Sequence, residues 1–258
     1  MIGAAPKRVA LVLLAMAICK STSAPTSGKE LSDARRAALA MEGDYFEGDI
    51  ITDEYPEIGR VATSNKSMLW PGGVVPYATD TTLGSQYSLE KIREAMDSIE
   101  EKTCLRFVPR EDQKDYLMLR SLDGCYSYIG RQGGEQTTSL GDGCIYKGLI
   151  IHELLHTVGF YHEHTRPDRD KYVTVFLKNV IPGQLHQFAK IDRKEIRPLG
   201  PFDYDSIMLY GSDAFSRSED LHTMVKKDGS LLTAVYLKTG LSDRDVRRIK
   251  NVYNCTTQ

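Results

Sequence analysis

The sequence predicts an α+β fold, with strands and two helices in its first part and a largely irregular second part that ends in a helix. Three observations support this prediction. Short apolar segments follow one another between residues 74 and 158, few periodic segments follow before residue 242, and four of the six histidines lie in residues 152–164, where the two parts meet. Hydrophobic residues make up 41% of the 258 residues, so the chain can bury a core and is neither disordered nor collagen-like. The net charge of −2 provides no basic field that would attract nucleic acid.

The first 23 residues are typical of a secretory signal peptide. Lys7 and Arg8 precede an unbroken apolar stretch from Val9 to Cys19, and small residues follow at positions 21–24. A short membrane anchor is the alternative, but the stretch is too short to span a bilayer comfortably. We therefore expect a secreted, extracellular protein without a membrane span.

Residues 24–60 are polar and charged and contain no cysteine. Residues 34–41 can form one short helix, and the segment ends at Gly59-Arg60, where a trypsin-like protease could cut. We interpret it as a pro-segment, with a plain flexible tail as the alternative. Residues 61–258 have the composition of a packed domain.

Within that domain, turn residues and apolar periodicity predict the individual elements. Strands are expected at residues 74–77, after the turn at residues 71–73, and at residues 105–108 and 116–119. A helix capped by Ser88 is expected to carry an apolar face made of Leu89, Ile92, Met96 and Ile99.

The pattern predicts two further helices. The first spans residues 148–158 and ends at Gly159, which suits a C-terminal cap. The second follows Ser242 as its N-cap and carries Val246, Ile249 and Tyr253 on one face.

Cysteine content fits an exported protein. Cys19 would leave with the signal peptide, and an even number remains, which implies two disulfides with three possible pairings. The remaining cysteines are Cys104, Cys125, Cys144 and Cys255. Asn65 and Asn254 each begin a pattern for N-glycosylation.

The histidine cluster has the spacing of a zinc site. His152 and His156 are four residues apart, so on a helix both imidazoles project from one face and can reach one ion. Glu153 stays close to that ion without binding it and can deprotonate a water molecule. Gly159 lets the chain reverse, which brings His162 to the same ion. Three neutral imidazoles on one Zn²⁺ per chain leave positions open for catalysis, and the full spacing is the metzincin pattern.

Beyond this core, the sequence resembles the astacin family of zinc endopeptidases. The run HELLHTVGFYHE at residues 152–163 continues into RPDRD at 166–170, and the family's Met-turn matches SIMLYG at residues 206–211. The resemblance covers about residues 46–255. It implies a zincin-like fold with a twisted mixed sheet and two helices in an N-terminal subdomain, an irregular C-terminal subdomain and an active-site cleft between them. It also implies a secreted endopeptidase that is made as a zymogen.

The resemblance assigns roles by position. His152, His156 and His162 would bind zinc, and Glu153 would be the general base. Tyr210 would bind zinc in the resting enzyme and hydrogen-bond the oxyanion during turnover. Two further residues lie near the site: Met208 would form the apolar floor below the zinc, and Glu163 would meet the N-terminus of the mature enzyme.

The resemblance also implies how the zymogen is silenced. Asp49, in the sequence FEGD at residues 46–49, would bind the zinc in place of the catalytic water. By the same analogy, Cys104 would pair with Cys255 and Cys125 with Cys144. The sequence departs from the family at Leu209, where histidine is usual, and at His164, where glutamine is more common. We expect His164 to be solvated or hydrogen-bonded and not to be a fourth ligand.

The expected partners are protein or peptide substrates and an activating trypsin-like protease, and we expect a monomer. An extended substrate is expected to pair with an edge strand of the N-terminal subdomain. Two alternatives remain open, a zinc-bound binding protein without activity and a module in which the metal serves folding alone. The intact Glu153 argues against the first, and an open site made of histidines argues against the second.

Overall fold

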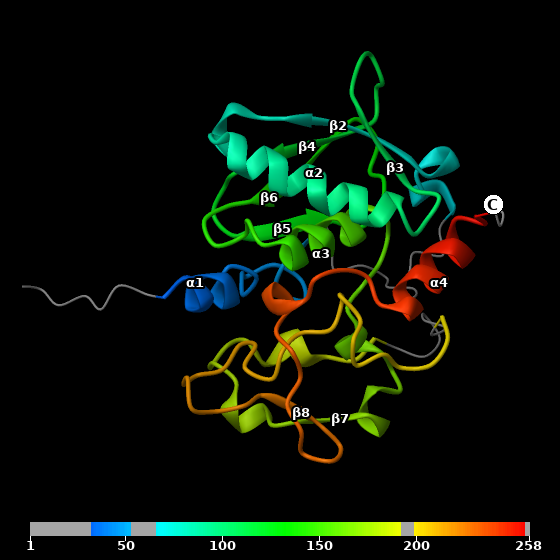
Figure 1. The fold of residues 1–258 in the computed structure, drawn as a ribbon. Coiled ribbons are helices and arrows are strands. Elements are labelled where there is room, and N and C mark those ends of the chain that lie inside the picture. Colours follow the sequence, from blue (N-terminus) through cyan, green and yellow to red (C-terminus); the bar gives the residue numbers. More distant parts are fainter. Residues whose placement is uncertain (1–31, 53–65, 192–198, 256–258) are drawn as a thin grey trace, which may run out of the picture. The chain divides into compact units, whose positions relative to one another are not determined.

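The computed structural model describes residues 32–52, 66–191 and 199–255, which belong to one compact unit spanning Leu31–Gln258. The predicted signal peptide, the activation site at Arg60 and the glycosylation pattern at Asn65 lie outside the described residues, so the boundaries 1–23, 24–60 and 61–258 stay predictions. The fold is α+β, as the sequence predicts (Figure 1). The helices are α1 (Asp33–Leu39), α2 (Gln86–Glu100), α3 (Lys147–Thr157) and α4 (Asp243–Val252).

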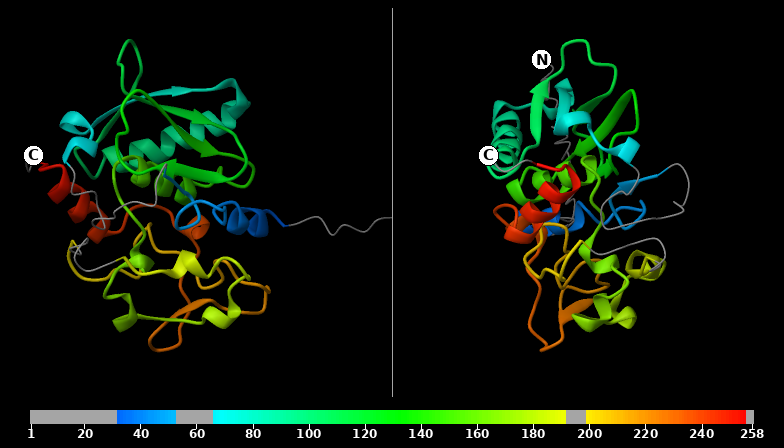
Figure 2. Two further views of the ribbon diagram at one scale, coloured as in Figure 1. Left: turned by 180° about the vertical axis from the view of Figure 1, so that it is seen from behind. Right: turned by 90° about the vertical axis from the view of Figure 1, so that its right-hand side faces the viewer.

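Six strands form one mixed sheet in the order β1-β5-β6-β4-β2-β3, in which only β5 and β6 are antiparallel neighbours. Its strands are β1 (Ile50–Ile51), β2 (Val74–Thr79), β3 (Arg106–Pro109), β4 (Tyr116–Arg120), β5 (Cys125–Tyr128) and β6 (Glu135–Leu140). A small antiparallel pair, β7 (Val173–Val175) and β8 (Met224–Lys226), belongs to the otherwise irregular second part. Helix α3 packs on β5, β6 and α2, which places both long helices on one face of the large sheet (Figure 2).

The three predicted strands are confirmed as β2, β3 and β4, with ends that differ by one or two residues. Strands β5 and β6 were not predicted, because their buried side chains are largely polar. The hydroxyls of Ser127, Thr138 and Thr157 lie 2.8–3.1 Å apart and join β5, β6 and α3. A buried hydroxyl cluster of this kind replaces the apolar alternation by which strands are recognised.

The N-cap of helix α2 lies three residues earlier than predicted. Ser85 is the N-cap, and its hydroxyl accepts a hydrogen bond from the amide of Ser88 at 3.1 Å. The prediction that Ser88 caps the helix is therefore wrong, since Ser88 lies in the first turn and is buried. The predicted core face is confirmed for Ile92, Met96 and Ile99, which are buried, but Leu89 is exposed.

The two remaining predicted helix starts are close to those observed. Helix α1 lies within the expected residues except for its first residue, and is capped by Ser32. Ser242 caps α4 as predicted, and Asp245 closes a capping box with it. Helix α4 buries Ile249 and returns the end of the chain toward the first part.

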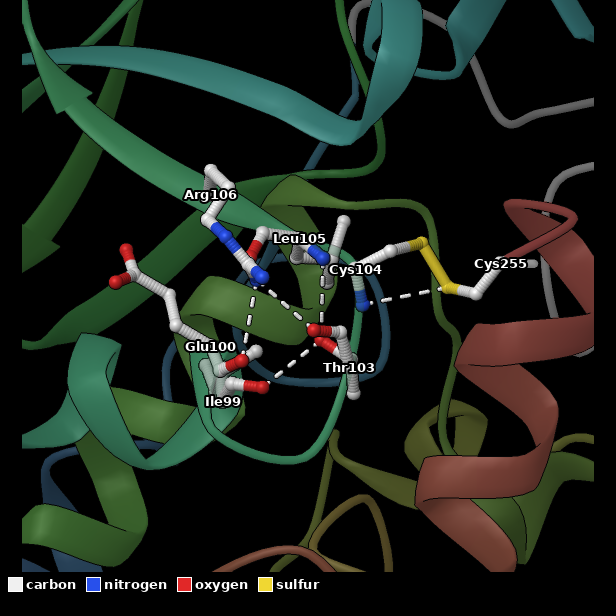
Figure 3. Close-up of a disulfide and its surroundings, with 7 residues drawn as sticks. All are labelled: Ile99, Glu100, Thr103, Cys104, Leu105, Arg106 and Cys255. Carbon is white, nitrogen blue, oxygen red and sulfur yellow. Dashed lines mark hydrogen bonds between the residues drawn. A yellow bond between two sulfur atoms is a disulfide. The ribbon is translucent and has the colours of Figure 1, made fainter. Parts of the chain in front are cut away.

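Two disulfides fix this arrangement and pair the cysteines as the family resemblance implies, Cys104 with Cys255 and Cys125 with Cys144. The first closes a loop with a sequence separation of 151. Where the chain leaves α2, the Thr103 hydroxyl donates to the Ile99 carbonyl at 2.8 Å, and the Cys104 amide points to the sulfur of Cys255 (Figure 3). The cross-link therefore joins the start of β3 to the chain end that follows α4.

Candidate metal centre

Helix α3 and the turn after it carry the three histidines. His152 and His156 lie one turn apart, and every residue of α3 from position 148 onward is buried. Gly159 has φ of 103°, a left-handed conformation that side chains other than glycine disfavour. Its amide donates to the His156 carbonyl at 2.8 Å, which ends the helix and returns His162 toward it. The predicted helix, glycine cap and reversal are all observed.

The three Nε2 atoms converge on one point. The distance is 3.0 Å from His152 to His162, 3.1 Å from His152 to His156 and 3.2 Å from His156 to His162. Nitrogens bound 2.0–2.1 Å from a tetrahedral zinc ion would stand roughly 3.3–3.4 Å apart, so the observed spacing fits zinc. All three side chains are fully buried.

The opposite ring nitrogens set the tautomers. The Nδ1 of His152 lies 2.8 Å from the Ile207 carbonyl, and that of His156 lies 2.7 Å from the Phe160 carbonyl. A carbonyl can only accept, so Nδ1 is the donor in each contact and Nε2 keeps its lone pair for a metal. The third ring differs, because the Nδ1 of His162 donates to the carboxylate of Glu47 at 2.7 Å.

Asp49 of the predicted pro-segment completes the cluster. Its carboxylate lies 3.2 Å from the Nε2 of His152, 3.3 Å from that of His156 and 3.4 Å from that of His162. Burial alone would raise the pKa of Asp49, but the neighbouring imidazoles outweigh it and hold the pKa well below the usual value. An anionic oxygen and three imidazoles form a donor set that suits zinc.

The turn at residues 206–211 brings Tyr210 against the histidines. The Tyr210 hydroxyl donates to Asp49 at 2.8 Å and lies 2.9 Å from the Glu47 carbonyl. Its ring stacks 5.9 Å from that of His152, and Met208 is buried in the core. Burial, followed by the charge of Asp49, raises the pKa of Tyr210, so the phenol stays protonated and can donate.

Glu153 is buried, and neither of its carboxylate oxygens has a hydrogen-bond partner among the described residues. Burial, and then the charge of Asp49, raises its pKa well above the usual value. A buried carboxyl without a protein partner is costly to maintain for structure alone. Its position on α3, next to the first histidine, is where a proton acceptor for a catalytic water is expected.

Sequence reasoning missed the groups that hold the turn. The Asp245 carboxylate of α4 accepts hydrogen bonds from the Ser206 hydroxyl at 2.7 Å and from the Ile207 amide at 2.8 Å. The ammonium of Lys238 donates to the carbonyls of Ser206 and Leu209, both at 2.6 Å. Asp245 could be recognised only as a capping residue, because its second role depends on the tertiary contact with the turn.

Glu163 is buried in a network of cations. Its carboxylate accepts hydrogen bonds from Arg166 at 2.9 Å and from two nitrogens of Arg248 at 2.9 Å. The predicted contact with a mature N-terminus stays a prediction, since Val61 lies outside the described residues.

The two departures from the family pattern are accommodated in the interior. His164 is buried, and its Nε2 donates to the Gln187 carbonyl at 3.1 Å, so of the two expected alternatives the hydrogen-bonded histidine is the one observed. Burial lowers the pKa of His164 well below the usual value, so it is neutral. Leu209 packs in the core.

Comparison with known proteins decides the family. The model of the peptidase family described as Astacin matches residues 62–254. The chain belongs to the astacin family. It is a zinc metalloproteinase by this membership, and the family resemblance stated from the sequence is confirmed.

Other astacin-family members match at similar levels. Zinc metalloproteinase nas-4 of Caenorhabditis elegans is 42% identical over 223 residues, which are 83% of this chain and 70% of that protein. Astacin-like metalloprotease toxin 2 of Loxosceles intermedia is 37% identical over 251 residues, 95% of this chain and 94% of the toxin. Among solved structures, the hatching enzyme zinc-protease High choriolytic enzyme 1 of Oryzias latipes matches with a TM-score of 0.65 and 35% identity, covering 81% of this chain and all of that one.

Proposed function

We propose that this astacin-family chain is a secreted endopeptidase, made as a zymogen, that cleaves extracellular proteins with Glu153 as general base. The observation that carries the proposal is the buried carboxylate of Glu153, which has no hydrogen-bond partner among the residues that the structure describes and lies on the same helix turn as two of three convergent imidazoles. A structural zinc module has no use for such a carboxylate, whereas a hydrolase needs a base beside its metal.

His152, His156 and His162 would hold one zinc ion per chain. When bound, zinc polarises the substrate carbonyl and lowers the pKa of a water molecule toward about 7. Glu153 accepts a proton from the attacking water and delivers it to the nitrogen of the leaving amine. The Tyr210 hydroxyl, once released from Asp49, donates to the developing oxyanion.

The pro-segment supports latency through two contacts. The carboxylate of Asp49 contacts all three Nε2 atoms. It therefore occupies the place where a water molecule would otherwise be activated. Strand β1 pairs with β5, with Ile50 opposite Ser127 and Ile51 opposite Tyr128. Without β1, β5 would be an edge strand of the large sheet, which is the type of strand that an extended substrate can join. The segment therefore covers both the metal ligands and the expected substrate edge.

Activation would follow cleavage after Arg60 by a trypsin-like protease. The new ammonium at Val61 could then reach Glu163, whose Oε2 accepts a hydrogen bond from Arg248 alone among the described residues. Secretion is supported by the signal-peptide pattern and by the two disulfides, which persist in oxidising compartments. Among the described residues, no helix is both long and apolar enough to cross a membrane.

Peptide hydrolysis by the activated enzyme tests the proposal. A peptide library should be cleaved by the wild type, not by Glu153→Ala, and a chelator should abolish cleavage reversibly. Glu153→Ala should keep its zinc, measured by elemental analysis, because Glu153 is not a ligand. Equal rates for the two proteins would refute the base assignment, and zinc-bound wild type without any cleavage would favour a binding protein.

A further inference from the structure

The Nδ1 atoms of the three imidazoles donate to acceptors from two different parts of the chain. His152 and His156 donate to backbone carbonyls of the metalloproteinase domain. His162 donates instead to Glu47, which belongs to the predicted pro-segment. Removal of the pro-segment therefore takes the Nδ1 partner from one of the three rings and leaves the other two unchanged.

Both the backbone conformation and the burial of Glu47 are unfavourable, and the contact with His162 accounts for them. Its φ of 53° is left-handed, a conformation that is unfavourable for a residue other than glycine. The side chain is 4% exposed, and within the described part of the chain its Oε1 has no hydrogen-bond partner. Its Oε2 accepts from both the Nδ1 and, at 3.3 Å, the backbone amide of His162. A surface turn would not need a buried glutamate in this conformation, so the contact with His162 explains the arrangement.

We propose that Glu47 is a positioning residue for the metal, and that the zymogen binds zinc more tightly than the activated enzyme because of it. The carboxylate fixes the Nδ1-protonated tautomer of His162, orients the ring and increases the basicity of its Nε2. Loss of such a partner typically costs 10–100-fold in metal affinity. By linkage, bound zinc strengthens the docking of the pro-segment by the same factor. The inference rests on the proposed zinc site and zymogen.

The zinc dissociation constant of the full-length precursor tests the inference, measured by competition with a chromophoric chelator. All proteins carry Glu153→Gln to prevent self-cleavage and Asp49→Ala to remove the direct ligand. A remaining difference in the zinc dissociation constant between two such proteins then measures the contribution of Glu47. Adding Glu47→Ala should raise the dissociation constant about 10–100-fold. Adding Asp44→Ala, which removes an exposed carboxylate of the same segment, should leave it unchanged. Equal constants for these two proteins would overturn the inference.

A second readout separates positioning from general loosening of the fold. In the zinc-loaded precursor, the hydrogen-bonded Nδ1 protons should give separate imidazole resonances in NMR spectra. Glu47→Ala should remove the signal of His162 and leave those of His152 and His156. Glu47→Gln should keep all three, with a smaller loss of affinity, because an amide oxygen still accepts. Persistence of the His162 signal in Glu47→Ala, or loss of all three, would overturn the inference. A parent precursor that binds no zinc would overturn the proposed function as well.

Discussion

Replacing Asp49 by alanine should turn a silent precursor into a partly active one. The carboxylate faces three imidazoles at 3.2–3.4 Å and the Tyr210 hydroxyl at 2.8 Å, without exposure to solvent. Removing one partner of a buried charged set costs about 3–5 kcal/mol. At about 1.36 kcal/mol per factor of ten, the open fraction of the precursor should rise by roughly two to nearly four orders of magnitude. Glu47 and the pairing of β1 with β5 remain, so the activity should stay below that of the cleaved enzyme.

The assay is hydrolysis of a quenched fluorescent peptide by precursors that carry Arg60→Ala and cannot be cut at the predicted activation site. Asp49→Asn should activate less than Asp49→Ala, because an amide oxygen can still accept from Tyr210. Asp44→Ala should stay silent, and Asp49→Ala combined with Glu153→Gln should show no gain. If the Asp49→Ala precursor hydrolyses peptide no faster than its parent, the aspartate block is wrong.

Three further predictions concern turnover and stability. Tyr210→Phe should lower the kcat of the activated enzyme about 10²–10³-fold with little change in KM or zinc content, measured by steady-state kinetics and elemental analysis. Burial raises the pKa of Glu42 to about 7 from 4.5, so the folded precursor retains a proton that the unfolded chain releases, and its stability should fall as pH rises from 4.5 to 7. Glu42→Gln should remove this fall, on the order of 3 kcal/mol, in denaturant unfolding at pH 5 and 8; an equal fall in both proteins would contradict it. Replacing Cys104 and Cys255 by serine should destabilise the enzyme by about 5 kcal/mol in the chain-entropy model, and an unchanged free energy of unfolding would refute that estimate.

Local patterns were sufficient where a residue acts through its own helix or turn. The i, i+4 histidines and the glycine that ends α3 could be recognised because their geometry depends on the helical repeat alone. The same holds for Ser242, whose capping box is closed by its own helix. Ser88 was misassigned because two serines are three residues apart, and periodicity does not decide which of them begins the helix.

Contacts between distant segments could not be predicted in this way. Strands β5 and β6 are stabilised by pairing and by buried hydroxyls, neither of which leaves an apolar alternation. The family resemblance placed Asp49 correctly at the histidines, but nothing in the sequence distinguishes Glu47 from a solvated charge. Its partner His162 is 115 residues away, and the contact exists only when the pro-segment docks.

The dependence of the turn at residues 206–211 on α4 has a consequence for biosynthesis. A nascent chain that ends before Asp243 already contains the three histidines, Glu153 and Tyr210, but it lacks Asp245, which ties the turn through Ser206 and Ile207. Synthesis from the N-terminus therefore produces the side chains of the metal centre before the helix that aligns them. The ribosome must finish the last helix before a competent protease can exist, and prematurely terminated products should be inert as well as unstable.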